Sequence, residues 1–464
     1  MNAPTPSRHF RNVYQASLSR RGFLAGATSL PLLNLTGCAT TDASMIGAGA
    51  TGTAAAPLTF SPVAATNADT VTVPPGYAWK TVIAWGDPLY EGDAAFDRTR
   101  LSEAEAERRF GFNNDMVALF PADWTFPAPD AVSDAMIMCV NHEYAQPHMT
   151  LGPDKNPATM TKEDYRTLFA QLGIAVVQLA KAGDDFEAVK EPAGPTAINR
   201  RITPFSEVVF SGPAADHPWI KTAGDFFNAA EAKAGRPAPK SGGVLCGTHS
   251  NCAGGFTPWG TYLSAEENFN FSFGFRVREG GPKVYAPEPG AQVFDHASFF
   301  YNAHMDPRRI PEGFEGLPDQ YDLAMNPTGG ALYGWTVEVD PYDPTYAPRK
   351  RTALGRRKGE CATTALAKDN RCVVYAGDDQ RNEFVYKFVS SRAFDPSNRL
   401  ANRDLLDNGV LYAARFNADN TGEWIALTVE AANAAAEEIG APAFTDLGDL
   451  MVRARHAARL LGAT

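Results

Sequence analysis

Residues 249–268 read HSNCAGGFTPWGTYLSAEEN, and this segment is the most informative in the chain. A single thiol, Cys252, stands in a glycine-rich turn, and a strand-like run then leads to the adjacent carboxylates Glu266 and Glu267. Thiolates bind soft or borderline metals such as zinc and iron, whereas carboxylates bind hard cations such as calcium. The segment therefore indicates a mixed-metal site. A buried cysteine followed by a solvated acidic pair is the simpler interpretation, because free cysteine commonly packs as a small apolar side chain.

Short runs rich in Val, Ile, Tyr and Phe recur around this segment, between clusters of Gly, Pro, Asn and Asp. The runs are 135–140, 334–339, 371–376, 384–389 and 410–416, and hairpin turns are expected at 368–370 and 418–422. Many short strands joined by hairpins predict an all-β sandwich, barrel or propeller. The pattern alone does not choose among the three.

Helices are expected to interrupt the β pattern. Thr161, with Asp164 three residues on, predicts a capped helix that continues to about Lys181. A second helix is expected at 430–439, and a third at about 445–461, stopped by Gly462.

The segment around Cys252 resembles the signature of the PhoX-type alkaline phosphatases, a bacterial family of secreted phosphomonoesterases. That signature is a Cys-Ala-Gly-Gly-x-Thr-Pro-Trp-Gly-Thr run that ends in an acidic pair. Further similar elements follow in the same order from about residue 71 to the end: 76–77 with 85–88, 140–144, 334–341, 377–388 and 411–424. The resemblance implies an all-β fold, a six-bladed β-propeller with helical insertions, and a metal-dependent phosphatase that hydrolyses phosphate monoesters.

The resemblance also sets the expected domain organisation. In the family, further β segments beyond the counterpart of the last helix complete the propeller. We therefore expect residues 71–464 to form a propeller domain that lacks its C-terminal closing segments.

The resemblance implies a diiron centre bridged by a cysteine thiolate, with calcium ions alongside, and Cys252 matches that cysteine. The carboxylate candidates for metal binding are Glu143, Glu266, Glu267, Glu360, Asp378 and Asp379. Adjacent strand residues point to opposite faces, so only one member of each adjacent pair easily faces a shared metal on a regular strand. Gly359 stands where the family has a histidine before Glu360, so a contact of that histidine is lost.

Arg381 and Lys358 are the candidates for binding phosphate in catalysis. Arginine binds phosphate oxygens in a bidentate manner, and lysine acts as a point charge. A surface ion pair is an equal alternative for Lys358. His142 ranks below Glu143 as a metal ligand, because a histidine beside a strand end is often a core residue.

The formal charge of the 464-residue chain is −11. Residues 1–37 hold four arginines and no acid, so the charge of the remainder is −15. An acidic surface repels nucleic acid, and we expect no nucleic-acid partner. Phosphate esters would be repelled too unless bound cations invert the local field. We expect a monomer that acts on small-molecule phosphate esters.

The N-terminus carries export signals. The twin-arginine pattern Ser19–Leu24 precedes an apolar stretch too short to span a bilayer, and Leu35-Thr36-Gly37-Cys38 has the form of a lipobox. Residues 1–38 therefore predict a twin-arginine signal with lipidation of Cys38, and residues 39–70, rich in Ala, Thr and Gly, predict a flexible linker. We expect a periplasmic or outer-membrane-anchored lipoprotein that contacts membrane only through that lipid.

Two other functions stay open from the sequence. A catalytically silent propeller could bind metal or a partner, and a related esterase could act on diesters or lactones. The remaining cysteines, 139, 246, 361 and 372, are expected to be buried thiols, with no bridge between Cys361 and Cys372.

Overall fold

The computed structural model describes residues 61–123, 133–156, 159–240, 242–274, 316–323 and 325–464. The chain separates into two compact units, residues 1–80 and residues 81–464. The twin-arginine pattern, Cys38 and residues 39–60 of the expected linker lie outside the described residues, and residues 61–70 are exposed. None of the described helices has the length and apolarity needed to cross a membrane.

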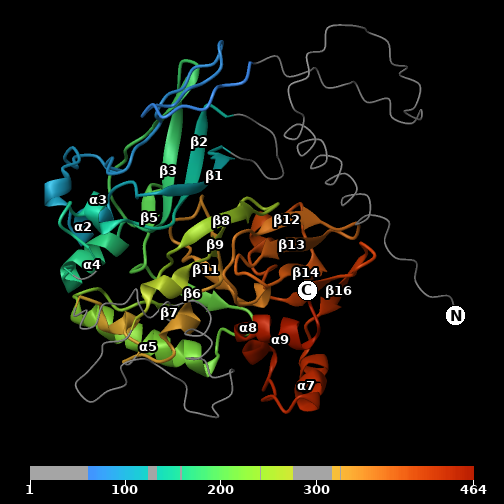
Figure 1. Cartoon of the computed structure of the whole chain (residues 1–464). Helices are drawn as coiled ribbons and strands as arrows, with labels where there is room; N and C mark the ends of the chain where they lie inside the picture. The colour runs from blue at the N-terminus through green and yellow to red at the C-terminus, as the bar shows by residue number, and fades with distance from the viewer. Residues whose placement is uncertain (1–60, 124–132, 157–158, 241, 275–315, 324) are drawn as a thin grey trace, which may run out of the picture. The chain divides into compact units, whose positions relative to one another are not determined.

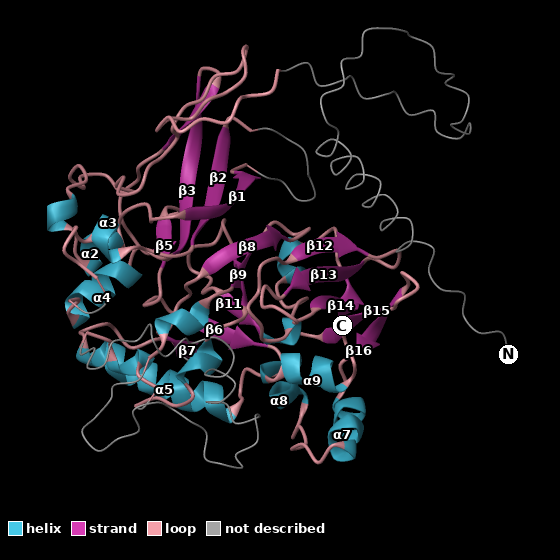
Figure 2. Ribbon diagram, in the orientation of Figure 1, coloured by secondary structure: helices cyan, strands magenta, loops and turns pink. Residues whose placement is uncertain are grey.

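The second unit is built on three β-sheets (Figures 1 and 2). The first sheet is antiparallel and has the order β1-β2-β3-β4, with β5 also paired to β3. Its strands are β1 Asn114–Pro121, β2 Ala135–His142, β3 Gly173–Ala182, β4 Asp185–Ala188 and β5 Arg200–Ile202. Strand β2 is buried on both faces, because Ile137 and Cys139 pack in one apolar cluster and Met136 and Met138 in another.

The second sheet has six strands in the order β7-β6-β11-β10-β9-β8. Its strands are β6 Val208–Ser211, β7 Gly243–Val244, β8 Asn251–Phe256, β9 Tyr262–Glu266, β10 Thr336–Val339 and β11 Arg349–Arg351. Strands β6 and β11 pair in parallel, and the other neighbours are antiparallel.

The third sheet is an antiparallel meander in chain order. Its strands are β12 Thr363–Leu366, β13 Arg371–Gly377, β14 Val385–Ala393, β15 Gly409–Phe416 and β16 Gly422–Ala426. Both predicted hairpins are present, between β12 and β13 and between β15 and β16. Cys372 lies opposite Leu366 and not opposite Cys361, in agreement with the expectation of no bridge between the two cysteines.

Strand β8 lies at the edge of the second sheet and contacts β1 and β2 of the first sheet and β12 of the third. Tyr262, Val337 and Val339 of the second sheet share an apolar cluster with residues of β1, β2 and β3. Residues close to either end of β8 can therefore meet side chains from all three sheets.

Short helices complete the unit (Figure 2). The α-helices are α2 Glu103–Ala106, α3 Pro147–Thr150, α4 Lys162–Phe169, α5 Pro218–Lys233, α7 Val429–Glu438, α8 Leu447–Val452 and α9 Ala454–Leu460. The 3₁₀ segments are Arg98–Arg100, Phe269–Ser272, Asp319–Tyr321, Gly329–Leu332, Thr352–Leu354 and Arg399–Asn402.

Two helix predictions need correction. The helix capped by Thr161 has the expected capping box with Asp164 but ends at Phe169, and residues 173–182 form β3 instead. Gly173, the first residue of β3, has φ 99°, which is incompatible with a continuing helix, and the run that follows contains Ile174, Val176 and Val177 and pairs with β2, β4 and β5. The last predicted helix is two helices, since Arg453 at φ −105° and ψ 29° separates α8 from α9.

The predicted fold class is confirmed at the level of a mostly β chain with helices between its strands. Within the described residues, the strands form three open sheets rather than a closed barrel. Cys139, Cys246 and Cys372 are buried free thiols as expected, whereas Cys361 is half-buried because it lies in the loop before β12.

Candidate metal centre

Cys252 lies on a β-bulge in β8. Asn251 is opposite Glu266 and Gly254 is opposite Ser264, so β8 has one residue more than β9 over this stretch. A bulge bends a strand and redirects the side chains on it, and bulges are common beside active sites. The Cys252 thiol is directed toward carboxylates of other segments, with its sulfur 3.9 Å from Asp115 Oδ2 and 3.8 Å from Glu360 Oε1.

The two glycines after Cys252 let other backbone segments approach β8 closely. A Cβ on Gly254 would lie 2.0 Å from the Leu263 carbonyl oxygen, and one on Gly255 would lie 2.1 Å from that of Ala362. The Ala362 amide donates to the Gly254 carbonyl oxygen at 3.0 Å. Glycine is therefore required at both positions, because a side chain at 254 would collide with β9 and one at 255 would push the segment that carries Glu360 away from β8.

Glu266 and Glu267 point to different environments, as the alternation of a strand predicts. The Glu266 carboxylate is fully buried and accepts from Lys350 Nζ at 2.7 Å and from the Gly334 amide at 2.9 Å. Glu267 follows the end of β9, and its amide donates to the Ser250 carbonyl oxygen at 2.8 Å. Asn268 Nδ2 donates to Glu267 Oε1 at 2.8 Å and so orients the Glu267 carboxylate.

Glu143 and Asp115 come from the first sheet. Glu143 directly follows β2, and its amide donates to the Asn113 carbonyl oxygen at 3.1 Å. Asp115 is the second residue of β1. Asn141 ties this sheet to the bulge, because its side-chain amide donates to the Cys252 carbonyl oxygen while its Oδ1 accepts from the Tyr262 hydroxyl at 2.9 Å.

Glu360 and Asp379 come from two segments that pair next to the third sheet. The Asp379 amide donates to the Lys358 carbonyl oxygen at 3.0 Å, and Gly359 bridges Asp378. This pairing places Lys358, Glu360 and Asp379 side by side.

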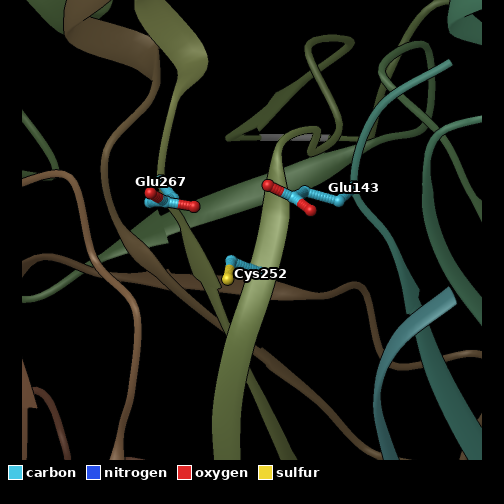
Figure 3. Close-up of side chains that lie close together, drawn as sticks. All are labelled: Glu143, Cys252 and Glu267. Carbon is cyan, nitrogen blue, oxygen red and sulfur yellow. The ribbon is translucent and has the colours of Figure 1, made fainter. Parts of the chain in front are cut away.

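Two groups of side chains have ligand atoms close enough to hold a metal ion. In each group the ligand atoms lie within 4.8 Å of one another: Glu143, Cys252 and Glu267 in one, and Glu267, Glu360 and Asp379 in the other. Figure 3 shows the Glu143 and Glu267 carboxylates pointing toward each other beside the Cys252 sulfur. Glu267 belongs to both groups, so the geometry suits adjacent ions that share a carboxylate.

The carboxylates repel one another in the absence of a cation. Burial, with contributions from Asp379 and Glu143, raises the pKa of Glu267 to about 8. Burial and the Asp115 charge raise the pKa of Glu143, and burial and the Asp379 charge raise that of Glu360. Burial likewise raises the pKa of the Cys252 thiol well above its ordinary value.

A multivalent cation would remove this repulsion. A thiol among carboxylates suits a borderline transition metal, and the all-carboxylate group suits a hard cation. The residues therefore fit the metals that the resemblance implies, and their chemistry is that of metal ligands rather than of a solvated acidic surface.

Apart from Lys358, four predicted residues are not brought into the two groups. Glu266 is paired with Lys350, and Asp378 is paired with Arg455 Nε at 2.7 Å. His142 is buried against Phe110, and one of its ring nitrogens accepts from the Gly111 amide at 3.3 Å. Arg381 is exposed in the turn after β13, and within the described residues no hydrogen bond or ion pair joins it to the groups.

Lys358 interacts electrostatically with Glu267 and Asp379, which belong to the two groups. Its side chain is buried beside the Phe271 ring, with Nζ 5.6 Å from the ring centroid. Burial lowers the pKa of Lys358 to about 8, and the charge of Arg455 adds to this, while Asp378, Glu267 and Asp379 oppose it. Even with this shift the ammonium form of Lys358 is favoured at neutral pH.

Asp115 and Asn268 are residues that the sequence interpretation missed. Asp115 is an acid near the start of a strand that continues Met-Val-Ala-Leu-Phe, two residues after Asn113, whose φ is 55°. An acid at such a strand end is a signal for a site. Asn268 follows the acidic pair directly, and its contact with Glu267 depends on the fold of the loop.

Comparisons with known proteins identify a family and a similar fold. The chain matches the family described as alkaline phosphatase PhoX over residues 58–464. Its fold is similar to that of Pseudomonas fluorescens PhoX, in a structure with vanadate, a transition state analogue, with 35% identity and a TM-score of 0.70. The match covers 87% of this chain and 64% of that one, so this chain spans less than two thirds of its length. The comparison with curated proteins gives no match.

Proposed function

Because the chain belongs to the PhoX family of alkaline phosphatases, we propose that it hydrolyses phosphate monoesters at the two metal-binding groups that share Glu267. The single observation that carries this proposal is the convergence of Cys252 with carboxylates from three sheets. The solved relative binds vanadate, a transition state analogue, and that likeness adds support.

Glu143, Cys252 and Glu267 would hold iron, and Glu267, Glu360 and Asp379 would hold calcium, by the preference of thiolates for transition metals and of carboxylates for hard cations. Asp115, whose Oδ2 is 3.9 Å from the Cys252 sulfur, is a further ligand candidate. When bound, such ions polarise the phosphoryl group and activate water.

The protein's own residues position the ester. The Lys358 ammonium binds the phosphoryl oxygens as a point charge. Asn268 holds the Glu267 carboxylate in place, and Asn141 holds the backbone of the bulge that carries Cys252. This orientation matters because a misplacement of about 1 Å can cost a hundredfold in rate.

The decisive experiment combines metal analysis with a phosphate-release assay. Purified protein should contain iron and calcium and release phosphate from monoesters, and a calcium chelator should abolish that release. Cys252→Ala should lose most of the iron, whereas Cys361→Ala, which removes the other half-buried thiol, should keep it. Bound metal without phosphate release would show a metal-binding protein and overturn the enzymatic function.

We also propose that the three sheets are blades of a β-propeller. The antiparallel meander β12–β16 is the arrangement that blades have, and β8 contacts both other sheets, as an inner strand would. An experimental structure with the sheets stacked as a sandwich would contradict this arrangement.

We further propose that the chain is exported by the twin-arginine route and anchored through a lipid on Cys38. Arg20→Lys with Arg21→Lys should leave precursor in the cytoplasm, because that route reads the arginine pair. Cys38→Ser should convert a detergent-requiring product to one that needs no detergent. Equal partitioning of both forms would instead indicate ordinary cleavage.

A further inference from the structure

A cavity of about 470 Å³ lies beside the metal centre, and Glu143 contributes to both. Two polar residues next to Glu267, Ser250 and Asn268, also line the cavity. Asn268 contacts Glu267, and the Ser250 carbonyl oxygen accepts from the Glu267 amide. The cavity therefore adjoins the groups at which the phosphoryl group would lie.

The remaining wall is mainly apolar and aromatic, with Ser272 as a further polar residue. Five rings line it: Tyr144, Tyr165, Phe169, Phe271 and Phe273. The Tyr165 hydroxyl donates to the Ser272 carbonyl oxygen at 2.9 Å, so this tyrosine presents its ring rather than a free polar group. Tyr165 and Phe169 have ring centroids 4.4 Å apart and form a rigid aromatic surface.

The backbone at Ser250, where the cavity adjoins the metal centre, has an unusual conformation. Ser250 has φ 55°, a left-handed conformation that is uncommon for residues other than glycine. Its hydroxyl is 3.1 Å from Nδ1 of the buried His249, and the His249 ring lies 4.2 Å from the Tyr333 ring. Such conformations persist where the surrounding structure enforces them, and they are concentrated at functional sites.

We propose that this cavity receives the alcohol part of the substrate, and that the protein prefers phosphate monoesters of alcohols that carry an aromatic ring. This inference rests on the proposed phosphatase function. The volume of the cavity is in the range of small-molecule sites, about 300–1,000 Å³. A substrate ring would find edge-to-face partners on the aromatic wall. Hydrolysis breaks the bond between phosphorus and the ester oxygen, water supplies the new oxygen on phosphorus and the proton on the alcohol, and the aromatic alcohol leaves from the cavity.

Two esters with matched leaving groups test the preference. Both 2-phenylethyl phosphate and ethyl phosphate release a primary alcohol, and they differ in the ring. We expect kcat/KM of the metal-loaded protein to be about tenfold or more higher for the ring-bearing ester, because burial of a ring of this size is favourable.

Variants of the cavity assign the preference to its wall. Tyr144 and Phe271 are 49% and 53% exposed, so truncating either ring does not threaten the core. Tyr144→Ala and Phe271→Ala should each lower the ratio of the two kcat/KM values about threefold to tenfold. Ala145→Phe should lower it further by filling the cavity. The matched control Phe416→Ala, an exposed ring outside the cavity, should leave the ratio unchanged.

A binding measurement separates the cavity from the chemistry. Calorimetry on metal-loaded protein should show tighter binding of 2-phenylethyl phosphonate than of ethyl phosphonate, with a negative heat-capacity change. If neither ester releases phosphate but the ring still increases affinity, the phosphatase function is wrong and the cavity assignment holds. Equal kcat/KM values and equal affinities for the paired compounds would overturn the aromatic preference.

Discussion

Glu266 and Glu267 are adjacent, but Glu266 lies in a buried ion pair and Glu267 belongs to both metal-binding groups. Isosteric variants of the two residues can distinguish these roles. Glu266→Gln should lower the free energy of unfolding by about 3–5 kcal/mol, because it leaves the Lys350 ammonium buried without its charge partner. Glu267→Gln should leave the unfolding free energy of metal-free protein equal or higher, because it removes one of several mutually repelling carboxylates.

Chemical denaturation and metal analysis give the two readouts. Glu267→Gln should lose bound metal, whereas Glu266→Gln should keep it under conditions where the variant is folded. Equal losses of stability in both variants would mean that Glu267 is a structural residue as well.

Lys358 offers a second prediction at this scale. Lys358→Met should raise KM for a phosphate monoester about tenfold or more, because a charge-assisted contact to the phosphoryl group is lost. Lys358→Arg should recover most of the affinity. Lys387→Met is the matched control, since Lys387 is a half-buried lysine that lies over the Tyr412 and Trp424 rings. An unchanged KM in Lys358→Met would show that Lys358 only balances the carboxylates.

The residues of the site were predictable to the extent that local rules decide them. The thiol and the acids were recognisable, and strand alternation indicated that one member of each acidic pair would face the site. Which member it is depends on the bulge at Cys252 and on the pairing of Gly359 with Asp378. Asp115 was missed because its contact with Cys252 is between residues 137 positions apart in the sequence and so depends on the fold.

The same distinction holds for whole elements. The β12–β13 and β15–β16 hairpins were predicted because turn residues and adjacent strands decide them locally. Strand β3 was predicted as a helical continuation of α4, because its β structure depends on pairing with β2, β4 and β5. Alternation of apolar residues gave no warning, because β3 is buried on both faces over its first half.

Helix α9 carries a prediction about acid stability. His456 lies in α9 near the Phe444 ring, and burial, with the charges of Arg453 and Arg459, lowers the pKa of His456 to about 4. The unfolded chain takes up this proton near pH 6.5, so the stability that the neutral ring provides is present above that pH and is lost as pH falls toward 4. We expect a loss of about 1–2 kcal/mol over this interval after solvent screening.

Equilibrium unfolding of wild type and His456→Gln across pH 4 to 7 measures this contribution. The variant should show a shallower decline than wild type, because glutamine does not titrate. Parallel declines would assign the acid sensitivity to other groups, such as the buried His142 and His249, whose pKa values burial also lowers.

In the folded unit as a whole, the proposed ions would link the sheets, because their ligands come from different sheets. Asp115 lies in the first sheet and Cys252 in the second, Glu143 and Glu267 directly follow strands of these sheets, and Glu360 and Asp379 flank strands of the third. Without cations these like charges oppose the contacts of β8 with β1 and β12. Metal binding should therefore stabilise the folded unit and not only equip it for catalysis.

Chelation should lower the melting temperature by roughly 3 °C where the free ion stood at about a hundred times its dissociation constant, since that excess contributes about 2.7 kcal/mol. Hydrogen exchange should rise mainly in β1, β8 and the segment before β12, where the sheets meet. Glu267→Gln should already melt near the chelated wild type and respond little to chelator, because Glu267 belongs to both groups. Lys387→Met, outside the groups, should respond as wild type does. If chelation lowered the melting temperature equally in wild type and Glu267→Gln, the stabilising ion would lie elsewhere. The ions at this site would then not link the sheets.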